Sequence, residues 1–541
     1  MAQRSNAGPP ERTQPWWQSG VLYQIYPRSF MDANGDGVGD LRGIISRLSY
    51  LKWLGVDAAW VSPFYPSPMA DFGYDVSDYT GVDPLFGTLS DFDALVAEAH
   101  RHDIKVILDY VPNHTSSEHP WFVESRSSRG NPKRDWYIWR EPSPDGGPPN
   151  NWRSVFGGGA WEWDENTGQY YLHMFDVKQP DLNWRNPEVR EAMYGAMRFW
   201  LDRGVDGFRL DAFNFLIKDD HFRDNPDNPD WQEGDPPWTR QRRIYSEDRP
   251  EMLGILREMR ALTDPYDGDR VLIGEIYLPL ERVVSYYGPE LDGVHLPFNF
   301  GLVELVTWEA RAVGRLIEEY EAALPEGAWP NWVLGNHDGP RIVGRVGEDR
   351  ARLVQMLLLT LRGTPTLYYG DEIGMHDVEV PPELIRDPQG VRSPGYGRDP
   401  YRTPMQWDAS PNAGFTTGRP WLPVAGDYTT TNVEAQREDP ASMLSLVRRL
   451  LRLRKNLPAL TLGGYHPLES GNDQVIAYLR EDEESRVLVA LNFGADSLNL
   501  ELPLDGAGGE ILCSTYPDRT GPLDPRGLEL GPYEGIIVSL G

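Results

Sequence analysis

Eight short apolar runs recur along the chain and alternate with stretches that have the apolar spacing of amphipathic helices. Helical spacing is clearest at Leu89–His102, Pro187–Leu201 and Arg350–Leu361. Eight parallel strands, each followed by a helix, close into a barrel. The pattern therefore predicts an α/β fold built on a (β/α)8 TIM barrel. The expected strands are Val21–Tyr26, Asp57–Val61, Lys105–Val111, Val205–Leu210, Val271–Ile276, Gly293–Leu296, Asn331–Leu334 and Thr366–Tyr369.

Two regions depart from this alternation. The stretch between the third and fourth expected strands is far longer than one crossover helix requires, which predicts an inserted subdomain after strand three. Beyond a last helix at Met443–Lys455, short strand-like runs such as Val475–Leu479, Val487–Asn492 and Ile536–Leu540 predict a C-terminal all-β sandwich. The predicted domains are 1–114 and 184–458 for the barrel, 115–183 for inserted subdomain B and 459–541 for the sandwich.

The charge balance excludes several kinds of partner. The chain has 52 basic and 82 acidic side chains, a formal net charge of −30. Such a surface repels phosphate backbones and anionic lipids, so neither nucleic acid nor a membrane is an expected partner. A single cysteine, Cys513, rules out an internal disulfide. With no apolar run typical of a signal or a membrane span, we expect a cytoplasmic protein. The sequence predicts no particular oligomeric state.

Polar residues follow four of the expected strands at the point where each strand ends. In a parallel barrel these carboxyl ends meet at one mouth, where catalytic residues gather. Salt-bridged strand caps are the alternative interpretation, but it would have to hold at four sites at once. The segments are DYVPNH with Asp109 and His114, GFRLD with Arg209 and Asp211, GEIY with Glu275, and GNHD with His337 and Asp338.

Two of these carboxylates have the setting of a nucleophile and an acid. Arg209 and Asp211 lie two residues apart and so share one face of a strand. We expect the arginine to lower the pKa of Asp211 and keep it ionised. Glu275 follows an apolar run, so we expect desolvation to raise its pKa and keep it protonated. This division of roles is typical of retaining glycoside hydrolysis, which predicts that the two carboxyl groups lie about 5–5.5 Å apart.

The same segments carry a family resemblance that covers almost the whole chain. DYVPNH, GFRLDAFNF, GEIY and NHD resemble, in order, signature segments of the α-amylase superfamily, glycoside hydrolase family thirteen. GVDAAWVSP and GTPTLYYGDE resemble two further segments, while QPDLNW, RTPMQW and DFGYDVSDY resemble the oligo-1,6-glucosidase and α-glucosidase branch. The resemblance implies the following roles: Asp211 as nucleophile, Glu275 as acid/base, Asp338 as third carboxylate, and His114, Arg209 and His337 as ligands of the same sugar.

The resemblance also implies a pocket closed at one end, as exo action requires. In this branch an Asp and an Arg pair across the pocket and bind the terminal sugar, while a Tyr ring stacks on it. The matching residues are Asp71, Tyr74 and Arg398. We therefore expect an Asp71–Arg398 salt bridge, with Arg402 as the competing partner.

The segment DANGDGVGD places oxygen ligands at alternate positions. These are Asp32, Asn34, Asp36, the Val38 carbonyl and Asp40. Such a set suits a hard cation, although Gly43 stands where an EF-hand has its bidentate glutamate. The resemblance implies a structural Ca²⁺ or Mg²⁺ here, and a hydrogen-bonded Asx turn without an ion is the alternative. No organic cofactor is expected.

The expected activity is that of a retaining, exo-acting α-glucosidase on short α-1,4-linked oligosaccharides such as maltose. Ala212 supports the expected preference for α-1,4 linkages, because α-1,6-preferring members of this branch carry Val at the matching position. A transglucosylase, or an oligo-1,6-glucosidase or isomerase, would use the same machinery and is the alternative. A non-enzymatic barrel serving a transporter is a third class, which the retention of all three carboxylates disfavours.

Overall fold

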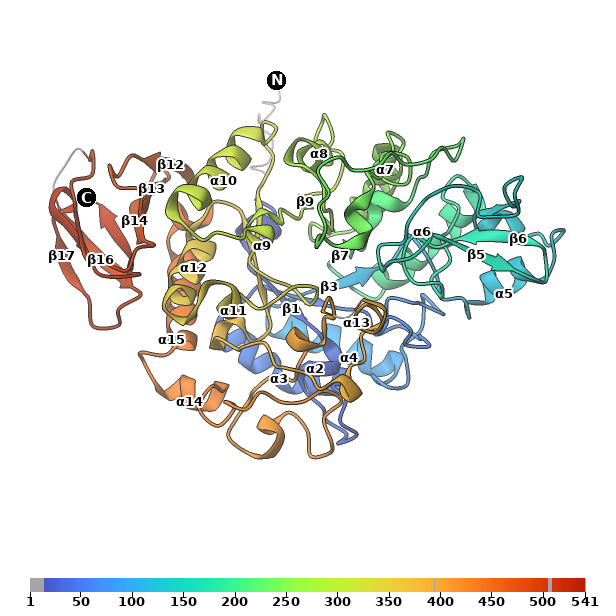
Figure 1. Ribbon diagram of the computed structural model, residues 1–541. Coiled ribbons are helices and arrows are strands. Elements are labelled where there is room, and N and C mark those ends of the chain that lie inside the picture. The colour runs from blue at the N-terminus through green and yellow to red at the C-terminus, as the bar shows by residue number, and fades with distance from the viewer. Residues whose placement is uncertain (1–13, 394, 505–507, 541) are drawn as a thin grey trace, which may run out of the picture.

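Eight parallel strands form the centre of the molecule (Figure 1). The computed structural model describes residues 14–393, 395–504 and 508–540. The strands are β1 (Leu22–Ile25), β2 (Ala58–Val61), β3 (Lys105–Tyr110), β7 (Gly207–Leu210), β8 (Val271–Gly274), β9 (Leu296–Pro297), β10 (Asn331–Val333) and β11 (Thr364–Tyr368). They pair in the order β10-β11-β1-β2-β3-β7-β8-β9. Within the described residues no ladder joins β9 to β10, so the barrel is nearly closed, and the predicted barrel fold is confirmed.

Apart from the sixth, the strands match the expected ranges to within two residues at each end. The sixth strand, β9, holds only Leu296 of the expected range, because Gly293 and Val294 hydrogen-bond back to the carbonyls of Tyr287 and Tyr286. The eighth strand, β11, begins at Thr364, two residues earlier than expected. The Thr364 hydroxyl donates to the Trp17 carbonyl, which ties this start to the bottom of the barrel.

Helices cover the outside of the barrel. Their ends follow from local sequence: Thr88 and Asp91 form a capping box before α4, and Asn186 caps α6, which starts with proline. The barrel helices are α1 (Trp16–Ser19), α2 (Pro27–Phe30), α3 (Leu41–Leu54), α4 (Leu89–Arg101), α6 (Pro187–Leu201), α7 (Met252–Thr263), α8 (Leu280–Ser285), α9 (Gly301–Glu304), α10 (Ala310–Ala323), α11 (Ile342–Val346), α12 (Glu348–Thr360), α13 (Pro388–Arg392), α14 (Val433–Glu438), α15 (Met443–Asn456) and α16 (Pro458–Thr461).

The barrel interior changes from apolar to polar along the strands. Leu22 and Ile107 belong to a buried apolar cluster inside the barrel. Two residues further along the same strands, the buried residues are Gln24 and Asp109. Because side chains alternate with a period of two, these polar residues also face inward. Asp109 is in register with Arg209 of β7, so an acid and a base lie side by side at the mouth.

Residues 115–183 lie between β3 and α6 and form a separate unit at the edge of the barrel. It holds α5 (Pro120–Ser127) and a three-stranded sheet of β4 (Trp139–Arg140), β6 (Gln169–Leu172) and β5 (Trp161–Asp164). Its core is aromatic: the rings of Phe122 and Trp139 stack 5.7 Å apart, and Tyr171 packs edge-on to both. Figure 1 shows this unit on the opposite side of the barrel from the C-terminal sheet.

The C-terminal domain is antiparallel, as predicted. Its larger sheet has the order β12-β13-β14-β19-β16-β17, and β15 pairs with β18 in a second sheet. Apolar residues of both sheets, including Leu488, Leu500 and Leu528, form one buried cluster. The described helices include none long and apolar enough to cross a membrane. The strands are β12 (Gly464–Leu468), β13 (Val475–Glu481), β14 (Arg486–Asn492), β15 (Leu498–Leu500), β16 (Gly509–Ser514), β17 (Gly521–Leu523), β18 (Leu528–Leu530) and β19 (Gly535–Leu540).

Candidate active site

Arg209 is the centre of a buried carboxylate cluster at the barrel mouth. Its Nη1 lies 2.7 Å from Asp109 Oδ1 and 2.6 Å from Asp211 Oδ1, and its Nη2 lies 2.8 Å from Glu275 Oε1. The backbone hydrogen bonds between neighbouring barrel strands continue beyond the strand ends. The Asp211 N–H donates to the Tyr110 carbonyl, and the Glu275 N–H donates to the Leu210 carbonyl. One guanidinium therefore fixes the relative positions of Asp211 and Glu275.

The protonation of Asp211 differs from the sequence prediction. Arg209 does favour its ionised form, but burial outweighs the arginine, and Glu275 and Asp109 add like charge. The net result is that the pKa of Asp211 lies well above its ordinary value, so the prediction of a lowered pKa was wrong. Burial and the neighbouring carboxylates thus oppose the ionised form of Asp211 that Arg209 favours.

Ala212 connects the two carboxylates through its backbone. Its N–H donates to Glu275 Oε2 at 3.0 Å. Strand β7 ends at Leu210, and Ala212 has a left-handed backbone with φ of 42°. Strand alternation therefore does not set the direction of its side chain, which lines the same cavity as Asp211.

Asp338 is held by two arginines from the segment after β11. Its Oδ1 lies 3.1 Å from Arg398 Nη1 and 2.8 Å from Arg402 Nη2. Burial raises the pKa of Asp338, but His337 and the two arginines outweigh burial and leave it below its ordinary value. Asp338 is therefore ionised at neutral pH. Arg402 also donates to the His337 carbonyl, so it pairs with Asp338 and leaves Asp71 to Arg398.

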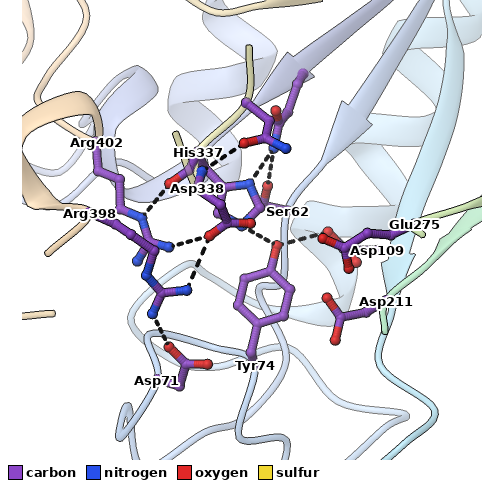
Figure 2. Close-up of polar contacts among 12 residues, drawn as sticks. Ser62, Asp71, Tyr74, Asp109, Asp211, Glu275, His337, Asp338, Arg398 and Arg402 are labelled. Atoms are coloured by element: carbon purple, nitrogen blue, oxygen red, sulfur yellow. Dashed lines mark hydrogen bonds and ion pairs between the residues drawn. The ribbon is translucent and has the colours of Figure 1, made fainter. Parts of the chain in front are cut away.

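The predicted salt bridge between Asp71 and Arg398 is present, at 2.7 Å. Arg398 also contacts Asp387 at 2.6 Å, a carboxylate that the sequence analysis missed because it lies in a loop with no motif around it. Tyr74 lies between the two groups of carboxylates (Figure 2). Its hydroxyl contacts Asp109 Oδ2 at 3.0 Å and His337 Nε2 at 2.7 Å, and its ring stacks on His337.

His114 lies on the inserted-subdomain side of the same cavity. Its Nε2 is 3.1 Å from Gln179 Nε2, and Gln179 also donates to Asp71 Oδ2 at 3.2 Å. Burial lowers the pKa of His114 to about 4, so its ring is neutral at physiological pH. Gln179 was not predicted as a site residue, although it opens the motif QPDLNW that carried part of the resemblance.

These side chains surround a cavity of about 480 Å³. Phe156 and Phe175 of the inserted subdomain add an aromatic wall, and the Arg398 guanidinium lies 5.1 Å from the centre of the Phe156 ring. Arg209 is not among the lining residues; it is buried behind the carboxylates. The predicted residues that line the cavity are Asp71, Tyr74, His114, Asp211, Glu275, His337, Asp338 and Arg398.

The predicted metal loop is closed by its own hydrogen bonds. Asp32 accepts from the N–H groups of Asn34, Gly35 and Gly37, Asp36 from Val38, and Asp40 from Ala33 and Gly43. Among the residues described, no three His, Cys, Asp or Glu side chains are arranged to hold a metal ion. The loop thus has the Asx-turn arrangement that the sequence left open. Its candidate metal ligands are all oxygen atoms, and the metal ion stays a prediction.

Comparison with protein-family models covers nearly the whole chain. Residues 24–463 match the catalytic domain of alpha amylase. Residues 465–537 match the C-terminal domain of maltogenic amylase. The change from one match to the other falls immediately before β12, the first strand of the C-terminal sheet.

Individual relatives are similar over their full length. A probable alpha-glucosidase of Rhizobium meliloti (strain 1021) is 44% identical over 91% of this chain and 92% of its own. An oligo-1,6-glucosidase of Heyndrickxia coagulans is 40% identical over 97% of this chain and 99% of its own. The crystal structure of an alpha-glucosyl transfer enzyme superposes with a TM-score of 0.92 at 44% identity, covering 98% of this chain and all of that one.

Proposed function

The chain belongs to the alpha-amylase family, and on that basis we propose that it is a retaining, exo-acting α-glucosidase. One observation carries the proposal. Asp211 and Glu275 are bound to the same guanidinium, in a cavity that the paired Asp71 and Arg398 also line. A nucleophile and an acid beside such a pair suit attack on the last sugar of a chain, whose hydroxyls the pair would bind.

The first step forms a covalent glycosyl-enzyme. Asp211 attacks the anomeric carbon of the terminal glucose, while Glu275 gives a proton to the glycosidic oxygen of the leaving group. Asp338, ionised by its arginine partners, accepts hydrogen bonds from the ring hydroxyls as the ring flattens. Arg209 stabilises the charge that remains on Glu275 once its proton has left.

The second step releases glucose. Glu275, now ionised, takes a proton from water, the water oxygen attacks the anomeric carbon, and the bond to Asp211 breaks. Two inversions give net retention, so the first product is α-glucose. Proton NMR of the hydrolysis of p-nitrophenyl α-glucoside, whose leaving group is not a sugar, tests this within the first minutes. An initial β anomer of the released glucose would refute the retaining mechanism.

Transfer to a sugar hydroxyl in place of water is the second candidate function. The similarity to an alpha-glucosyl transfer enzyme favours it as a side activity of the same intermediate. Incubation with concentrated maltose should then give trisaccharides in addition to glucose. Chromatography of the products measures the ratio of transfer to hydrolysis.

We propose an α-1,4 preference, supported by the small side chain of Ala212 beside the nucleophile. The similarity to an oligo-1,6-glucosidase supports α-1,6 cleavage as the alternative. Comparison of kcat/KM for maltose and isomaltose separates them. A value for isomaltose equal to or above that for maltose would overturn the α-1,4 proposal.

We also propose that the loop from Asp32 to Asp40 binds a structural Ca²⁺ or Mg²⁺. Its donors are carboxylate, amide and carbonyl oxygens, which suit a hard cation. Binding would require carboxylates such as Asp32 to exchange N–H groups for the ion. Calorimetric titration of the metal-stripped protein with Ca²⁺ and Mg²⁺ should give one site, which Asn34→Ala weakens; no binding heat and no change in melting temperature would contradict it.

Finally, we propose a cytoplasmic location, supported by the lone cysteine, Cys513, which is buried. A single cysteine cannot form an internal disulfide, which is typical of proteins kept in a reducing compartment. Cell fractionation with antibody detection tests the location.

A further inference from the structure

The cavity extends over two halves of the barrel. The Asp71–Arg398 pair comes from segments that follow β2 and β11. Two other lining carboxylates, Glu247 and Glu304, come from segments that follow β7 and β9. Since β2 and β11 lie on one side of the sheet order and β7 to β9 on the other, the leaving group must lie toward Glu247 and Glu304.

Glu247 is held in a fixed position on this second side. Asn214 Nδ2 donates to its Oε2 at 3.1 Å, and the Asn214 carbonyl accepts from Asp248 N–H at 2.8 Å. Asp248 is in turn anchored to Arg282 at 2.7 Å. The segment that carries Glu247 is therefore tied both to the strand end that carries the nucleophile and to α8. The mechanism above makes no use of this carboxylate.

Tyr277 offers a flat surface on the same side. It lines the cavity, is 46% exposed, and its ring stacks on Phe300 with centroids 4.1 Å apart and planes at 10°. A supported, exposed aromatic ring suits the apolar face of a pyranose. A carboxylate and such a ring in one cavity are the two elements that bind a sugar by its edge and its face.

We propose that Glu247 determines leaving-group specificity by accepting hydrogen bonds from the hydroxyls of a second, uncharged sugar ring. The inference rests on the proposed glucosidase activity and extends it to the leaving group. Glu304 and Arg243 line the same end of the cavity as Glu247, so two carboxylates and one guanidinium lie there. The excess of negative charge disfavours sugars that carry a phosphate on the leaving ring.

The first test compares two substrates that differ only in the leaving group. Maltose must place a glucose beside Glu247, whereas α-glucosyl fluoride places only a fluoride ion there. The ratio of kcat/KM for maltose to that for the fluoride should fall about 10- to 100-fold in Glu247→Ala, as expected for loss of a hydrogen bond to a charged group. Assays run at pH 8, above the pKa of about 7 to which burial raises Glu247 between Arg243 and Asp248.

Glu233→Ala is the matched control, because Glu233 lies exposed in the same segment and does not line the cavity. Turnover of the fluoride reports whether each variant is folded. An unchanged ratio in Glu247→Ala would overturn the inference and leave the glucosidase proposal standing. Failure of the unmodified enzyme to hydrolyse either substrate would instead refute the glucosidase proposal.

The second test isolates the charge. Glu247→Gln keeps the size and an acceptor oxygen but removes the negative charge. The preference for maltose over maltose phosphorylated at C6 of its reducing glucose should narrow about tenfold in this variant. A preference equal to that of the unmodified enzyme would show that the carboxylate does not face the leaving ring, and would overturn the inference.

Discussion

Buried arginines occur in two regions of this protein. They contact carboxylates in the active site and backbone carbonyls at the junction with the C-terminal domain. In the active site Arg209 and Arg398 face carboxylates. Burial lowers the pKa of each guanidinium, but the carboxylates more than reverse this. At the junction with the C-terminal domain, Arg454 and Arg480 face backbone carbonyls, and burial lowers their pKa values to about 10 and about 9.

The junction arginines hold the end of one helix. Arg454, from α15, donates to the carbonyls of Leu359, Leu361 and Gly363. Arg480, from β13, donates to those of Thr360, Gly463 and Gly464. The last carbonyls of a helix have no partner within the helix and attract positive charge. These arginines therefore join the two domains through the C-terminal end of α12.

The positive charge of the arginines has a different role in the two regions. Six carboxylates share three arginines in the active site, so negative charge is in excess there, and the raised pKa of Asp211 means that its ionisation costs stability. At the junction each guanidinium satisfies carbonyls that would otherwise be buried without donors. We conclude that the first cluster serves chemistry and the second serves folding.

The largest expected effect separates activity from stability in the active site. Asp211→Asn should lower kcat for maltose by roughly four orders of magnitude, because the nucleophile is lost. The raised folded-state pKa of Asp211 means that ionisation at neutral pH opposes folding, so the neutral variant should melt at a higher temperature. Calorimetry and steady-state kinetics measure both. A lower melting temperature would contradict our account of the cluster.

The opposite outcome is expected at the junction. Arg480→Met should destabilise the protein by about 3 kcal/mol, since three buried carbonyls lose their donor. The midpoint of the first unfolding transition in urea measures this, and kcat/KM for maltose should not change. Arg526→Met is a control for loss of one arginine, because Arg526 is exposed. Equal shifts of the urea midpoint in the two variants would show that the buried arginine contributes no more to folding than an exposed one.

Dependence on pH between pH 7 and pH 5 should appear in the active site and not at the junction, whose arginines titrate only at higher pH. Burial raises the pKa of Asp71 to about 6 against the pull of Arg398, and that of Asp109 to about 6 against Arg209. Below pH 6 these carboxyls take up protons and lose their ion pairs, so kcat/KM for maltose should fall about tenfold per pH unit for each carboxyl that must be ionised. A constant kcat/KM between pH 7 and pH 5 would show that neither carboxylate is needed in its ionised form.

The smallest expected effect concerns linkage. Ala212→Val should raise the ratio of isomaltose to maltose kcat/KM several-fold, because one or two methyl groups are worth about 1–3 kcal/mol in discrimination. It should also lower the melting temperature, since a β-branched residue is disfavoured at a φ of 42°. Ala212→Gly is the control, because glycine adopts this left-handed backbone conformation without strain and adds no methyl group. A ratio that Val leaves unchanged would remove the basis of the α-1,4 proposal.

The sequence by itself determined the barrel, its helices and the C-terminal sheets. These follow from local periodicity, which packing then preserves, and the order of polar strand ends placed Asp211, Glu275 and Asp338 at one mouth. The resemblance to the α-glucosidase branch, which DFGYDVSDY helps to carry, predicted the Asp71–Arg398 pair.

Only the tertiary structure decided the protonation of the active-site carboxylates and which residues distant in the sequence join the site. The pKa of Asp211 depends on how fully the cluster is desolvated and on which carboxylates share Arg209, and no spacing along the chain encodes either. Asp387 and Glu247 lie in loops without periodicity, so their roles depend on how the loops fold over the mouth. Local sequence sets where a strand ends, whereas the balance between burial and distant charges is a property of the folded chain.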